Sequence, residues 1–228
     1  MKNIRQIILI AIGCLSFLAF TRANAQIIIS EVDPTGSATS TYAADWFELT
    51  NTGTSAVDIT GWKMDDNSNS FGSSVALRGV TSIAAGQSVV FIEGNSTGST
   101  DSTIQANFKT AWFGSNVPAG FTIGGYGGSG VGLSSTSDAV NIFNSTGTLI
   151  TRVDFGAATT GVSFDNSAGL NNTVISTVSV AGTNGAFTSP TGEVGSPGAV
   201  PEPSTCALML GGFIALLGFQ VIRRNKVA

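Results

Sequence analysis

The chain has 228 residues, 11% of them charged, and a formal net charge of −4, which fits one domain with appended segments. It contains 29 glycines and no histidine, so its composition excludes a Ser-His-Asp triad and histidine-ligated metal sites. Between Gln26 and Val200, four basic residues stand against 13 acidic ones, and this net charge of −9 disfavours nucleic acid as a partner.

The N-terminus has the three parts of a secretory signal peptide. Basic Lys2 and Arg5 precede an apolar run over 7–20, and the small residues Ala23 and Ala25 form the A-x-A pattern before a cleavage site. An uncleaved membrane anchor is the alternative, but the run is shorter than the roughly 20 residues that a span requires. We therefore expect signal peptidase to remove residues 1–25.

The middle of the chain, residues 26–199, consists of short apolar or alternating runs separated by turn-forming residues. Such runs predict short strands, and their number and spacing favour an all-β sandwich or barrel. The predicted strands are 26–32, 46–49, 57–59, 61–64, 88–92, 139–143, 149–155 and 174–180. The segment 144–147, with the sequence Asn-Ser-Thr-Gly, predicts a hairpin turn between two of them.

Two segments of the middle region depart from the strand pattern. Apolar residues at 104, 108, 111 and 112 have helical spacing, which predicts a short helix over 104–113 that covers one sheet edge. Six glycines lie within 124–132, and this stretch is predicted to be a mobile loop.

Three stretches of the middle region together resemble a known family. Residues 28–32, 45–53 and 57–66 are similar to the lamin-tail domain, an immunoglobulin-like β-sandwich found in nuclear lamins and in many bacterial secreted proteins. Gly195–Ala199 is similar to the Pro-Gly close of bacterial examples, whereas the Ser/Gly-rich stretch 114–137 departs from the pattern. The resemblance implies an immunoglobulin-like sandwich over 26–199 that acts as a scaffold or interaction domain. It brings no catalytic residues and no cofactor.

Two pairs of residues each admit a functional and a structural interpretation. Trp46 and Trp62 could form a sugar-stacking platform, but each alternates with polar neighbours as an inward-facing strand residue does, so a place in the core is favoured. Glu31 and Glu48 could be the acid and nucleophile of a glycosidase. Acids on strands more often lie on the solvated face, which is the favoured interpretation here.

One turn is rich in oxygen ligands of the kind that calcium prefers. The candidate ligands are Asp65, Asp66, Asn67 and Asn69. The EF-hand pattern fails, because Ser70 stands where glycine belongs and Ala76 where the bidentate glutamate belongs. An Asx-rich turn between strands is therefore favoured, and no metal is expected.

The C-terminus combines a proline motif, an apolar helix and a basic cluster. The motif is Val200, Pro201, Glu202 and Pro203; the apolar run is 206–222; the cluster is Arg223, Arg224 and Lys226. Seventeen residues of helix reach about 25 Å, a short but workable membrane span. The arrangement of residues 200–228 resembles the PEP-CTERM sorting signal, which implies a temporary inner-membrane anchor processed by an exosortase. A permanent single-pass anchor is the alternative.

Taken together, these features favour a non-enzymatic exported protein of the cell surface or extracellular matrix. Its expected partners are signal peptidase, an exosortase-type enzyme, the inner membrane through 206–222, and exopolysaccharide or other surface proteins. The alternatives are a Ca²⁺-dependent carbohydrate-binding module acting on exopolysaccharide and, more weakly, a secreted hydrolase.

Overall fold

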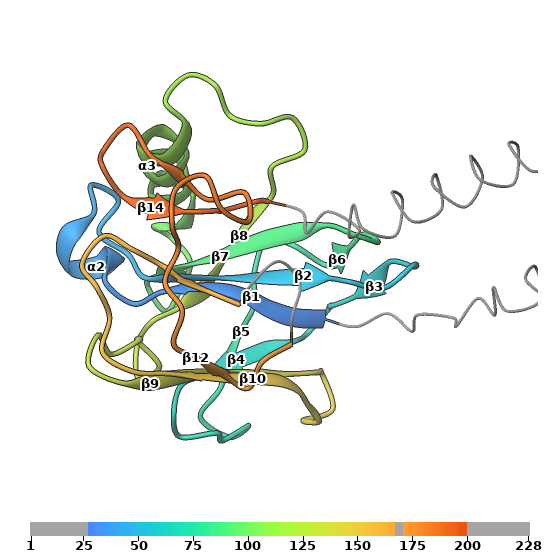
Figure 1. The fold of residues 1–228 in the computed structure, drawn as a ribbon. Coiled ribbons are helices and arrows are strands. Elements are labelled where there is room, and N and C mark those ends of the chain that lie inside the picture. The colour runs from blue at the N-terminus through green and yellow to red at the C-terminus, as the bar shows by residue number, and fades with distance from the viewer. Residues whose placement is uncertain (1–26, 167–170, 200–228) are drawn as a thin grey trace, which may run out of the picture.

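Two five-stranded β-sheets packed face to face form the body of the protein (Figure 1). The computed structural model describes residues 27–166 and 171–199. The first sheet has the order β11 (Phe164–Asp165), β1 (Ile27–Asp33), β2 (Trp46–Asn51), β7 (Ser88–Gly94) and β8 (Ile123–Gly127). The second has the order β12 (Val174–Ile175), β10 (Leu149–Phe155), β9 (Asp138–Phe143), β4 (Lys63–Asp65) and β5 (Val75–Ala76). Two short pairs, β3 (Val57–Asp58) with β6 (Ser82–Ile83) and β13 (Phe187–Thr188) with β14 (Val194–Gly195), complete the strands.

The main hydrophobic core lies between the two sheets. Alternate residues of each strand point into it, as the period-two pattern of a strand requires: Phe47 and Leu49 come from β2, and Val140 and Ile142 from β9. Trp62 belongs to this core and is 8% exposed. The predicted mostly-β sandwich is therefore confirmed, and the arrangement is consistent with an immunoglobulin-like fold.

The predicted helix is also confirmed. It is α3 (Asp101–Phe113), which packs over β7 and β8 at one edge of the first sheet. Phe108, Ala111 and Trp112 are its buried residues, and they meet outward-facing side chains of the first sheet in a second apolar cluster. A four-residue helix, α2 (Gly36–Thr39), follows β1. The first sheet is therefore covered on both faces.

The first part of the glycine-rich stretch 124–132 is a strand, so the prediction of a mobile loop is wrong there; residues 128–132 form a turn. The strand is β8, which runs parallel to β7 and is buried along its length. A Cβ atom at Gly124 would lie 2.6 Å from the backbone oxygen of Arg78 and 2.7 Å from the ring of Phe91. These glycines allow a close approach of backbone and side chains, which sequence composition cannot distinguish from flexibility.

The segment predicted as the last long strand changes sheets instead. Its first part is the short strand β12, which pairs in parallel with β10 of the second sheet. Further along, Val178 forms an isolated bridge with Phe164 of the first sheet. The predicted hairpin turn between β9 and β10 is confirmed. There Oδ1 of Asn144 accepts hydrogen bonds from the backbone of Thr146 and Thr148, and Gly147 has a φ of 86°.

The chain finishes as a third layer on the outer face of the first sheet. Residues 187–199 lie there beside α3 (Figure 1), and we call residues 193–199 the C-terminal strap. The last residue described, Ala199, accepts a hydrogen bond through its backbone oxygen from Oγ of Ser88, 2.8 Å away. Ser88 pairs with Thr50 and Thr50 with Ile28, so the described chain begins and ends at the same end of the first sheet.

Some sequence predictions fall outside this part of the chain. Ala23, Ala25, the motif over 200–203 and the apolar run 206–222 are not among the described residues. Within residues 27–166 and 171–199, no helix combines the length and apolar character needed for a membrane crossing.

Candidate functional site

Glu31 and Glu48 lie directly opposite each other on β1 and β2. A register shift between Ile29 and Glu31 marks a bulge in β1. Strict alternation from Ile29, which points into the core, would send Glu31 there too; the bulge instead turns it to the outer face and returns Val32 to the core. The local irregularity of β1 thus places both carboxylates side by side beneath the C-terminal strap.

Hydrogen-bond donors of the protein itself occupy both carboxylates. Oε1 of Glu31 accepts from the backbone N–H of Ser196 at 2.7 Å and from the hydroxyl of Ser163, and Oε2 accepts from the hydroxyl of Ser196 at 3.1 Å. Glu48 accepts from the hydroxyl of Ser30 at 2.7 Å and from the backbone N–H of Gly198. The two glutamates therefore fasten the strap to the first sheet.

The prediction that these acids lie on a solvated face is wrong. Each glutamate is 1% exposed, because α3 and the strap cover the sheet face that would otherwise meet water. Two glycosidase carboxylates must reach a sugar and a water molecule between them. Covered by the strap and bonded to its donors, this pair lacks that access.

Burial also changes the acidity of the pair. Burial, followed by the nearby charge of Glu48, raises the pKa of Glu31 well above its usual value. Burial raises the pKa of Glu48 to about 7, and the hydrogen bonds from Gly198 and Ser30 offset only part of that rise. Near neutral pH the pair therefore holds protons that exposed glutamates would have lost.

A third glutamate, Glu193, ties the start of the strap to an aromatic cluster. The hydroxyl of Tyr42 donates to Oε1 of Glu193 at 2.8 Å, and the same hydroxyl accepts from the indole N–H groups of Trp46 and Trp112. Trp46 is fully buried, with its ring edge-on to those of Trp112 and Phe108. The core interpretation of Trp46 and Trp62 is confirmed, although Trp46 belongs to the second cluster outside the sandwich.

The four candidate calcium ligands share one turn but do not converge as a set. Asp65 is buried; its Oδ2 accepts from the hydroxyl of Ser68 and the backbone of Ser70, and its Oδ1 is buried without a hydrogen-bond partner. Asp66 forms the expected Asx turn, since its Oδ1 accepts from the backbone of Ser68 at 2.9 Å. The turn continues with Asn67, whose Oδ1 accepts from Arg152, and Asn69, which has a φ of 49°. Within the described part of the chain, no three or more Asp, Glu, Cys or His side chains are arranged to hold a metal ion.

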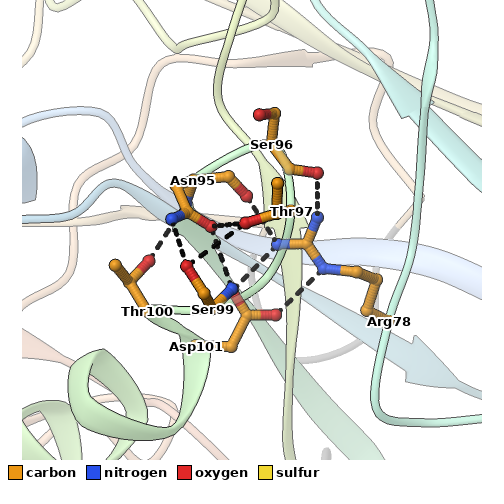
Figure 2. Close-up of polar contacts among 7 residues, drawn as sticks. All are labelled: Arg78, Asn95, Ser96, Thr97, Ser99, Thr100 and Asp101. Carbon is orange, nitrogen blue, oxygen red and sulfur yellow. Dashed lines mark hydrogen bonds and ion pairs between the residues drawn. The ribbon is translucent and has the colours of Figure 1, made fainter.

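A cluster of polar contacts around Arg78 was not predicted from the sequence. The guanidinium of Arg78 donates two hydrogen bonds, of 2.9 and 2.8 Å, to the carboxylate of Asp101. Figure 2 shows the two side chains facing each other. The same side chain donates to the backbone oxygens of Asn95 and Ser96, while the Asn95 backbone N–H donates to the hydroxyl of Thr100. Arg78 thus closes the loop between β7 and α3 and fixes the start of the helix. The partners stand 17 to 23 residues from Arg78, so no local motif announces them.

Comparison with protein families identifies the middle of the chain. The family model for the Lamin Tail Domain matches residues 21–157. No curated protein matches the chain. The matched range includes most of both sheets, and it stops before β11, β12 and the strap.

Proposed function

The chain belongs to the lamin tail domain family, and from this premise we propose that it is a non-enzymatic exported protein that presents an interaction or scaffold domain. Its proposed place is the cell surface or the extracellular matrix. Other surface proteins or exopolysaccharide are the proposed partners there. The family match, which covers more than half of the chain, is the observation that carries the proposal.

The buried carboxylates support a non-enzymatic role. The sequence offered one acid pair for hydrolysis, Glu31 and Glu48, and both are 1% exposed and bonded to donors of the protein itself. The two glutamates hold the strap on the first sheet and are not accessible to a substrate, which agrees with a family whose immunoglobulin-like domain serves as a scaffold.

The two ends of the sequence support export and sorting. Ala23 and Ala25 supply a signal-peptidase pattern, and residues 200–228 supply the order of motif, apolar run and basic cluster. We propose that signal peptidase releases the N-terminus and that an exosortase-type enzyme processes the tail near Pro201. The inner membrane is then a transient partner, through 206–222.

Intact-mass analysis of the protein from the cell envelope and from the medium tests this proposal. The expected mature chain runs from Gln26 to near Pro201. A double variant, Pro201→Ala with Pro203→Ala, keeps the apolar run and the basic cluster and is expected to retain the tail. A wild-type species that still carries Arg223 and Lys226 would show a permanent anchor and overturn the sorting step.

A further inference from the structure

The C-terminal strap is joined to the first sheet through side chains. Ser196 bonds to Glu31 on β1, Gly198 to Glu48 on β2 and Ala199 to Ser88 on β7. The strap crosses the three strands within four residues. Two of these three contacts are to ionisable acceptors, while Val194 near the start of the strap adds backbone bonds with Gly161 and Ser163.

The fit of the strap over these glutamates is close. A Cβ atom at Gly195 would lie 2.6 Å from Oε1 of Glu31 and 2.8 Å from the ring of Trp112 on α3. With glycine there, the backbone lies directly on the carboxylate and separates it from water. Opening the strap would return both glutamates to solvent.

The charged groups facing the pair are acidic. Glu31 and Glu48 act on each other, and Asp165, opposite Glu31 on β11, acts on Glu48. The charged residue of the strap itself, Glu193, bonds to Tyr42, and α3 turns Trp112 toward the pair. When the glutamates ionise, the hydrogen bonds from Ser196 and Gly198 favour the closed strap, but burial and mutual repulsion outweigh them.

We propose that Glu31 and Glu48 form a proton-dependent latch, which holds the strap closed when they are protonated and loosens it as they ionise. The sign follows from linkage. A glutamate whose pKa is higher under the closed strap than in water favours closure below its ordinary pKa, and this contribution is lost as the pH rises through the higher value. For Glu48 the interval runs from 4.5 to about 7.

Hydrogen exchange of the Ser196 and Gly198 amides tests the latch in the full-length protein. From the Glu48 interval alone, protection corrected for intrinsic exchange should fall by roughly 50- to 100-fold between pH 5 and pH 8. Amides of β9, the central strand of the second sheet, should remain more protected at both pH values. Equal protection at pH 5 and pH 8, or exchange of Ser196 and Gly198 at the rate of β9, would overturn the proposal.

Two variants test whether Glu31 and Glu48 cause the pH dependence of strap protection. Glu48→Gln mimics the protonated side chain: its amide oxygen can accept from Gly198, and its N–H can donate to Ser30. We expect the fall in protection to be smaller than in the wild type, because only Glu31 still titrates, and the strap to be better protected at pH 8. Glu93→Gln is the matched control, because burial also raises the pKa of Glu93 on β7 but its carboxylate lies beside Gly128, away from the strap. A pH dependence as large in Glu48→Gln as in the wild type, or its loss in Glu93→Gln, would contradict the latch. The wild-type measurement stands even if a variant fails to fold.

Discussion

Predictions for single residues were correct on one face of a strand and wrong on the other. The prediction that Trp62 lies in the core is confirmed. The alternation of apolar and polar residues along a strand indicates which side chains face the interior of the sandwich. Glu31 and Glu48 were placed wrongly, because the opposite face is covered by distant segments that alternation does not reveal. Of the 13 acids between Gln26 and Val200, eight are buried, so the surface is less acidic than the net charge of −9 indicates. They are Glu31, Asp33, Asp45, Glu48, Asp65, Asp138, Asp165 and Glu193.

Replacing Trp62 by alanine should lower the free energy of unfolding by about 3–5 kcal/mol, because it removes a large buried aromatic side chain from between the sheets. Denaturant unfolding measures this change. The control is Val174→Ala, which shortens an apolar side chain that is 64% exposed and should have almost no effect. A Trp62→Ala variant as stable as the wild type would mean that this side chain is exposed in solution.

At the scale of elements, sequence spacing predicted α3 but not what fixes its position. The apolar residues of the helix repeat locally, whereas the Arg78–Asp101 pair joins the segment after β5 to the first residue of α3. The same limit explains β8, whose glycines are required by the packing of Phe91 and Arg78 against it. Contacts between segments far apart in sequence leave no periodic signal.

Replacing Asp101 by asparagine should destabilise the protein by about 1–2 kcal/mol, because charge-assisted hydrogen bonds to Arg78 become neutral ones. The pair is partly shielded, with side-chain exposures of 26% and 16%. Asp154→Asn in the more open pair with Arg152, where the aspartate is 42% exposed, is the matched control and should cost less. Unfolding at low and high salt compares the two, and equal losses would argue against a special role for the Arg78 cluster.

For the whole molecule, the sequence predicted the class of the fold but not its third layer. Short strands with turn signals indicated a sandwich, and residues 28–66 indicated the family. The C-terminal layer was missed because β13 and β14 have only two residues each and the strap is rich in Gly, Ser and Pro. Their burial depends on α3 and the first sheet. The candidate site was therefore predictable in its residues, Glu31 and Glu48, but not in its burial or in what covers it.

The melting temperature should be higher at pH 5 than at pH 8. Burial raises the pKa of Asp45 to about 6 and that of Glu48 to about 7, and it also raises the pKa values of Glu31 and Asp33. Each raised pKa stabilises the folded protein below the ordinary pKa and ceases to do so as the pH rises through the folded value, so stability is lost mainly between pH 4.5 and 7. Glu48 alone accounts for a change on the order of 3 kcal/mol.

Thermal unfolding at constant ionic strength over this range measures the effect, and Glu48→Gln should show a flatter profile. A melting temperature that rises with pH would show that the buried acids are paired or hydrated in solution.

The attachment of the strap also has a mechanical consequence. The described chain leaves the first sheet at Ala199, so tension on the C-terminal end would load the contacts in turn: Ala199, then Gly198, then Ser196. Because these contacts would break one after another, the strap should detach at low force. In contrast, β1 is paired with β2 and β11, and a pull along its axis would load many hydrogen bonds at once. Fully extended, the seven residues of the strap span at most roughly 25 Å, which limits how far they can lengthen before the sheets carry the load. Under tension on the C-terminal end, the strap would therefore detach first and the sandwich would stay folded.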